Sequence, residues 1–326
     1  MSNPRPDSFS HNPRGSLKPQ GAYCERADLL RLRFAARDLN LSARRPAQSL
    51  LTGGTRTRLR GRGVDFEEVR LYQPGDDVRS IDWRVTARTQ VPHTKIYREE
   101  RERPVFVVVD QRSPMFFGSR TCFKSVLASH LAALLGWAAL NQSDRIGGLV
   151  FGDDSQRDIR ARRSKHALLD LLHQLHDYNH RLSSPLPLEG GLSLANILTD
   201  TRRVAKPGNA LFILSDFHDF DRTSEQQLFE LARHTDITLM HLYDPLEREL
   251  ASNSPLSVSD GRQRCRLPAQ DPRFQRAYRN QFEQRLAQLK TSCNRLALPL
   301  MSLATDDDIH GLMRERFGAR GKRRAA

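Results

Sequence analysis

Cysteine is scarce in this chain, and the placement of the few cysteines excludes two classes of protein. The 326 residues include four cysteines: Cys24, Cys122, Cys265 and Cys293. No two of them form the Cys-x-x-Cys pair typical of zinc sites, and they are too far apart to indicate a disulfide framework. This usage is typical of a reducing compartment, so we expect a cytoplasmic protein.

Long apolar runs are also lacking. None approaches the roughly 18–20 residues that a membrane-spanning helix needs. The longest, 126–140, contains Ser129 and His130 and is typical of a buried core helix. The first 21 residues carry basic side chains but no apolar segment of the kind found in a secretory signal. We therefore expect no membrane span, a disordered N-terminus over 1–21 and a solvated basic tail over 318–326.

Lysine is rare in a composition that is otherwise strongly basic. Only seven of the 52 basic residues are lysine, while the formal net charge is +14 and the pI is near 10.3. An arginine excess is typical of nucleic-acid binding, of an acidic protein partner, or of a GC-rich genome. No aromatic platform or known nucleic-acid module accompanies the basic stretches, so we do not expect nucleic acid as the main partner. No GxxxxGK[ST] loop occurs, so we expect no nucleotide hydrolysis by this chain.

Apolar strands alternate with helices from residue 104 onward. We expect strands at 105–109, 145–151, 210–215, 237–242 and 296–303, an antiparallel edge strand at 157–161, and helices at 121–141, 164–178, 193–204, 223–234, 270–293 and 306–317. The polar stretch 246–268 is expected to be a loop or an insertion. This order predicts an α/β fold over 101–317, with a three-layer, doubly wound, mostly parallel sheet, preceded by a charged segment over 22–100.

Two aspartates directly follow buried strands. Asp110 ends the 105–109 run, and Asp216 follows 210–215. Ligands of parallel sheets bind beyond the carboxyl ends of the strands, so these carboxylates and the hydroxyls of Ser113 and Ser193 form a candidate Mg²⁺ site. Alternatively, the two carboxylates cap the helices that follow them.

This arrangement resembles the von Willebrand factor type A domain. The metal-ion-dependent adhesion site of that domain has the pattern Asp-x-Ser-x-Ser, then a distant Thr and a distant Asp. Here Asp110 and Asp216 match, Arg112 and Pro114 occupy the two Ser positions, and Ser193 is nearest to the Thr position. Proline offers no ligand, while a guanidinium repels a cation and pairs with carboxylates. We therefore expect a degenerate site in which Arg112 replaces the metal by pairing with Asp110 or Asp216, so that Mg²⁺ is disfavoured and no cofactor is needed.

Charged residues gather in 61–100, around a Pro74-Gly75 pair that is typical of a type II turn. The block contains Arg70, Asp76, Asp77, Arg79, Asp82, Trp83, Arg84 and Arg88. Acids and arginines interleave, and no nearby His or Cys completes a hydrolytic set. We therefore expect salt bridges among these side chains, with Trp83 packed beneath them.

The same block resembles the family called domain of unknown function 58. The residues that carry the resemblance are Gly61, Gly63 and Phe66; Arg70, Tyr72, Gly75, Asp76 and Arg79; and Ile81, Asp82, Trp83, Ala87 and Arg88. Together with the domain that follows, the resemblance covers about 45–305. It implies a bacterial protein that works with a MoxR-type AAA+ ATPase, and with another type A domain protein, in protein maturation or cofactor insertion.

On this resemblance we expect a non-enzymatic adaptor. Its contact surface would be the strand-end face around Asp110, Arg112, Ser113 and Asp216, with the 61–98 block bracing or extending that face. Two other functions stay open from the residues: a metal-dependent enzyme that uses the Asp110/Asp216 crevice, and nucleic-acid binding through the arginine excess.

Overall fold

The chain forms two compact units. The computed structural model describes residues 18–41, 64–73, 76, 78–99, 104–183, 191–250, 254–259 and 264–318. The smaller unit lies within 45–102, and the larger combines 1–44 with 103–326.

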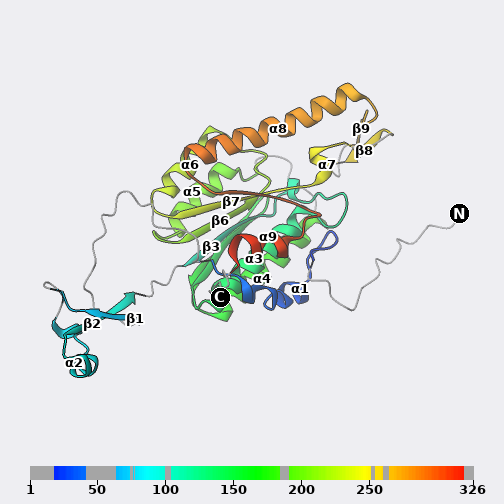
Figure 1. Cartoon of the computed structure of the whole chain (residues 1–326). Helices are drawn as coiled ribbons and strands as arrows, with labels where there is room; N and C mark the ends of the chain where they lie inside the picture. The colour runs from blue at the N-terminus through cyan, green and yellow to red at the C-terminus, as the bar shows by residue number, and fades with distance from the viewer. Residues whose placement is uncertain are drawn as a thin grey trace, which may run out of the picture. The chain divides into compact units, whose positions relative to one another are not determined.

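A six-stranded sheet forms the centre of the larger unit (Figure 1). Its strands, in spatial order, are β10 (Leu300–Ala304), β7 (Asp236–Tyr243), β6 (Ala210–Ser215), β3 (Val105–Asp110), β4 (Ile146–Phe151) and β5 (Gln156–Arg162). All neighbouring pairs are parallel except β4 and β5, which are antiparallel. The predicted mostly parallel sheet with an antiparallel edge strand is confirmed.

Helices cover both faces of this sheet (Figure 1). One face packs against α1 (Arg26–Arg31), α3 (Lys124–Asn141), α4 (Lys165–Asn179) and α9 (Ile309–Phe317). The other packs against α5 (Leu194–Val204), α6 (Arg222–Ala232) and α8 (Pro272–Arg295). In β3, Val105, Val107 and Val109 join the first core, whereas Phe106 and Val108 join the second. Successive side chains of a strand point to opposite faces of the sheet, so a strand that is apolar on both faces belongs in the middle layer of a three-layer α/β fold.

Residues 22–41 are part of the first of these cores. Helix α1 and the 3₁₀ helix η1 (Ala35–Asp38) bury Leu29, Leu32 and Ala36 against it. The Trp137 indole of α3 donates a hydrogen bond of 3.0 Å to the Leu29 carbonyl. These short helices depend on packing, because the six residues of α1 are too few to be stable alone.

The expectation of a loop over 246–268 is wrong in part. The chain there forms α7 (Pro245–Arg248) and a hairpin of β8 (Leu256–Ser259) and β9 (Arg264–Leu267). Asp244 and Glu247 form a capping box that starts α7, since each side chain satisfies a backbone N–H at the helix start. Polar composition hid these short elements because their strands bury little apolar surface.

In the smaller unit, β1 (Val64–Leu71) pairs antiparallel with β2 (His93–Glu99). Between them lie the 3₁₀ helix η2 (Val78–Ser80) and the helix α2 (Trp83–Thr89). Asp82 begins α2, because its Oδ1 accepts hydrogen bonds from the backbone N–H groups of Arg84 and Val85 at 3.0 and 3.3 Å. Two further 3₁₀ turns, η3 (Ser113–Met115) and η4 (His180–Ser183), belong to the larger unit.

Throughout the part of the chain that the structure describes, each helix is either too short or too polar to span a bilayer.

Candidate functional site

The carboxyl ends of β3 and β6 bring the two predicted aspartates to one edge of the sheet. The strands are parallel neighbours, with Val109 opposite Leu214. Asp110 is the last residue of β3, and Asp216 directly follows β6. Both side chains are buried, Asp110 completely. The sequence-derived placement of these two carboxylates beside each other holds in the structure.

Arg112 fills the space at the end of β3. Its Nε and Nη2 donate to the two Asp110 oxygens at 3.1 and 2.8 Å. Its Nη1 and Nη2 donate to the two oxygens of Asp219 at 2.6 and 3.0 Å, and Nη1 also donates to the Leu192 carbonyl at 3.1 Å. Arg112 is only 4% exposed, and its guanidinium forms a bidentate hydrogen-bonded pair with each carboxylate.

Asp110 is held by more than this ion pair. Its Oδ1 accepts the Arg112 backbone N–H at 3.0 Å, and its Oδ2 accepts the Ser215 hydroxyl at 2.6 Å. Burial raises the pKa of Asp110, and the charge and hydrogen bonds of Arg112 oppose that rise. Burial by itself would lower the pKa of Arg112. The charge of Asp110 and the hydrogen bonds to Asp219 outweigh burial and raise this pKa above its usual value. The four donors around Asp110 serve its ionised form.

Asp216 belongs to a different cluster. Its Oδ2 accepts from Lys124 Nζ at 2.8 Å, and its Oδ1 accepts from the His218 ring at 2.9 Å. Lys124, 1% exposed, also donates to Glu247 at 2.7 Å. Burial works to raise the pKa of Asp216, but the hydrogen bond from His218 and the charge of Lys124 bring it below its usual range. Arg112 therefore pairs with Asp110 rather than with Asp216.

The two serines are engaged elsewhere. The Ser113 backbone N–H and hydroxyl both donate to Asp153. The Ser193 hydroxyl caps α5 by accepting the Asn196 N–H at 3.2 Å. Each of the four proposed ligands thus has its own polar partner, and a guanidinium stands between two of the nearby carboxylates. This donor set does not fit the octahedral oxygen shell that Mg²⁺ requires. Among the described residues, no group of three His, Cys, Asp or Glu side chains is arranged to hold a metal ion.

Sequence reasoning missed several residues of this edge, among them Lys124, Asp219 and Glu247. A lysine at the start of an otherwise apolar helix was a usable signal, because a buried ammonium needs a carboxylate partner. Asp219, three residues beyond Asp216, was a second signal. Glu247 lay in the stretch expected to be a loop.

The charged block of the smaller unit is partly as expected. Arg70 Nη2 donates to Asp76 Oδ1 at 2.8 Å, which is one of the predicted salt bridges. Asp82 caps α2. Arg79 lies in η2, whereas Arg84 and Arg88 lie in α2; the side chains of all three are exposed. Asp77, Pro74, Gly75, Gly61 and Gly63 lie outside the described residues, and Phe66 lies in β1.

The expectation that Trp83 packs beneath these charges is wrong. Its side chain is 68% exposed. Helix α2 has only seven residues and none is buried, so no core lies under it to receive the indole.

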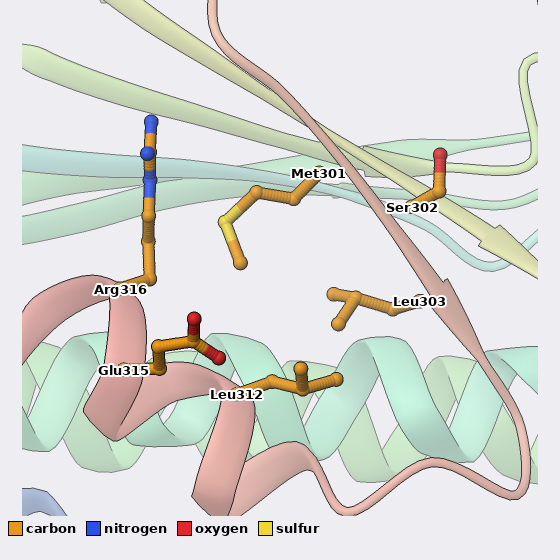
Figure 2. A pocket seen from close by; sticks show the side chains of 6 residues that line it. All are labelled: Met301, Ser302, Leu303, Leu312, Glu315 and Arg316. Atoms are coloured by element: carbon orange, nitrogen blue, oxygen red, sulfur yellow. The ribbon is translucent and has the colours of Figure 1, made fainter.

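A cavity of about 310 Å³ opens beside Asp216, where the ends of β6 and β7 meet helices α7 and α8. A second hollow, of about 270 Å³, lies between β10 and α9. In Figure 2 the Met301 and Leu303 side chains reach from the strand toward Leu312 and Glu315 of the helix. The second hollow contains neither the strand-end aspartates nor their partners.

Comparison with known proteins points to a family without an assigned activity. The family model with the description "Protein of unknown function DUF58" matches residues 68–292. An uncharacterized protein of Mycobacterium tuberculosis is 28% identical over 279 residues, which is 85% of this chain and 86% of that protein. An uncharacterized protein of Mycobacterium bovis matches with the same identity and coverage.

Proposed function

This chain belongs to the family described as "Protein of unknown function DUF58", and on that premise we propose that it is a non-enzymatic adaptor that works with a MoxR-type AAA+ ATPase. Its client process would be protein maturation or cofactor insertion in the cytoplasm. A second protein with a type A domain would be a further partner.

The observation that carries this proposal is that the charged side chains at the carboxyl end of β3 are already paired with one another. In many sheets of this kind, free carboxylates or hydroxyls at this edge bind a ligand or carry out chemistry. Here Asp110 has four donors and Arg112 is shared by two carboxylates, so the side chains at the end of β3 are committed to one another. We propose that this edge is a degenerate metal-ion-dependent adhesion site of a type A-like domain. Arg112 would take the place of the ion and keep the edge rigid for a partner.

The smaller unit offers a second contact surface. Among the described residues of this unit, the large apolar side chains that are exposed are Leu71, Val78, Trp83 and Val91. Tryptophan is enriched among the residues that dominate binding energy at protein interfaces. The formal net charge of +14 would in addition speed the encounter with an acidic partner.

The test is direct binding between this full-length chain and a purified MoxR-type AAA+ ATPase from the same organism, measured by biolayer interferometry at several salt concentrations. We expect saturable binding that weakens as salt increases. Trp83→Ala should weaken it by about tenfold or more, as for a dominant interface residue.

Phe229→Ala is the matched control, because Phe229 is a similarly exposed aromatic residue (52%) on α6 of the larger unit. It should leave the affinity unchanged. Failure of the ATPase to bind would contradict the adaptor function. Equal losses of affinity for Trp83→Ala and Phe229→Ala would contradict the assignment of the interface to the smaller unit.

A further inference from the structure

The cavity beside Asp216 has aromatic walls that come from three segments. His241 and Tyr243, two residues apart on β7, lie on the same face of the sheet, with their rings stacked at 5.6 Å and 12°. Phe282 of α8 packs 5.4 Å from the Tyr243 ring and 6.1 Å from the His241 ring. Phe217, after β6, and Tyr278, one helical turn before Phe282, complete the wall. Walls of this kind favour a planar ligand that stacks against rings.

One polar atom in this wall has no partner. His241 is 6% exposed, and within the described residues its Nδ1 makes no hydrogen bond. A buried polar group without a partner costs about 1–3 kcal/mol, so such groups are rare and need an explanation. Nδ1 has almost no accessible surface in the ligand-free protein, so a ligand in the cavity would form a hydrogen bond with it once the imidazole ring turns toward the cavity.

Charges of both signs line the cavity, and one of the cations has no carboxylate partner among the described residues. Asp216 and Glu247 line it, but both carboxylates bind the buried Lys124 ammonium, and the second oxygen of Glu247 accepts the Asp244 N–H at 2.8 Å. Arg285 also lines the cavity from α8, and it makes no hydrogen bond or ion pair with any residue that the structure describes. A guanidinium in such a position favours an anion, above all a carboxylate, which it can bind with two parallel hydrogen bonds.

We propose that this cavity binds a planar aromatic carboxylate, with its ring against the His241, Tyr243 and Phe282 rings and its carboxylate on Arg285. The cavity volume suits one ring system with a short acidic arm. Two sources share this chemistry: a free aromatic acid, and an aromatic residue at the C-terminus of a peptide. The proposal does not depend on the ATPase partner.

The test uses the full chain and isothermal titration calorimetry. The first probe is indole-3-acetate, and indole-3-acetamide is its uncharged control. We expect saturable binding of the acid and about tenfold weaker binding of the amide, which is the loss of one charge-assisted contact. N-acetyl-Gly-Gly-Trp, with a free or an amidated C-terminus, separates the two sources. Tighter binding of the free peptide than of indole-3-acetate assigns the site to peptide ends, and weaker binding assigns it to free acids.

Two variants locate the contacts. Arg285→Gln should abolish the preference for acid over amide, whereas Arg276→Gln should retain it. Arg276 lies on the same helix, is exposed and does not line the cavity, so this control removes an equal charge. His241→Phe keeps a ring in the wall and should weaken both probes by a similar factor. It should also raise the melting temperature of the ligand-free protein, because the unpartnered nitrogen is gone.

Three results would overturn the proposal. The first is the absence of saturable binding by every probe up to about 10 mM, a concentration that reveals fragment-sized ligands of built sites. The second is an unchanged preference for the acid in Arg285→Gln. The third is tighter binding of adenosine 5′-monophosphate than of any carboxylate, which would assign the cavity to nucleotides.

Discussion

Arg112 and Asp219, 107 residues apart in the sequence, are joined by two hydrogen bonds of 2.6 and 3.0 Å. The same guanidinium holds Asp110 at the end of β3. Asp219 in turn accepts the Leu194 N–H at 2.8 Å, at the start of α5. One arginine therefore ties together the ends of β3 and β6 and the beginning of a helix.

Removal of this arginine should destabilise the fold strongly. Arg112→Met leaves Asp110 buried with its ion-pair partner lost, and breaking a buried pair in this way costs about 3–5 kcal/mol. We expect a loss of that order in the free energy of unfolding, measured by urea denaturation. Arg112→Met/Asp110→Asn should recover part of it, since no buried charge remains on Asp110.

The exposed pair of Arg120 and Asp306 is the matched control for this experiment. Arg120→Met should change the free energy of unfolding by no more than about 1 kcal/mol, as surface ion pairs do. An equally small loss in Arg112→Met would contradict the central role of Arg112.

Divalent ions should not bind at the strand-end edge. Because Arg112 occupies the position between Asp110 and Asp219, an incoming cation would meet a fixed positive charge. Titration calorimetry with Mg²⁺ and with Mn²⁺ should give no saturable heat in the micromolar range, and neither ion should raise the melting temperature. Saturable micromolar binding that disappears in Asp110→Asn would refute metal replacement and favour a metal-dependent enzyme.

His130 should make the stability of this protein depend on acidity. The ring is 3% exposed in α3, and burial lowers its pKa to about 4, whereas the charges of Asp28 and His310 and the Val126 carbonyl act more weakly on it. In the unfolded chain its pKa is about 6.5. The folded protein favours the neutral ring. The contribution of His130 to the free energy of unfolding is therefore complete above pH about 6.5 and is lost as the pH falls toward about 4.

Urea denaturation at pH 7 and pH 5 tests this dependence. Between the two, the parent protein should lose about 2 kcal/mol more than His130→Leu, whose side chain cannot be protonated. His166→Leu, at an exposed position of α4, controls for the loss of a histidine. Equal pH dependence of the parent and His130→Leu would show that the buried ring is protonated without penalty.

The four cysteines should differ sharply in reactivity. Burial raises the pKa of Cys24 and Cys122 to about 12 and that of Cys293 to about 11, whereas Cys265 is exposed in β9. The thiolate is the reactive form, so N-ethylmaleimide should modify the native protein at Cys265 and modify all four cysteines after denaturation. Mass spectrometry of the intact protein measures this, with Cys265→Ser as the control. Rapid native labelling of Cys265→Ser would mean that a buried cysteine becomes accessible.

Local patterns predicted most of the larger unit. The apolar run at 105–109 and the leucine spacing of 164–178 gave β3 and α4 within two residues of their observed bounds. The hairpin of β8 and β9 was missed, because its strands are four residues long and largely exposed, so they lack the apolar alternation that identifies a strand. Trp83 was assigned to a core that its short helix does not possess.

For the candidate site, the chain order alone determined that Asp110 and Asp216 directly follow apolar strand patterns and that Arg112 stands two residues after Asp110. These are properties of neighbouring residues, and they can be read without a fold. Only the tertiary structure decided that Arg112 takes Asp219 as its second carboxylate and that Lys124 takes Asp216. Those pairings depend on β3 lying beside β6 with α3 packed across them, and the adjacency of strands far apart in the chain is decided by burial of the whole sheet.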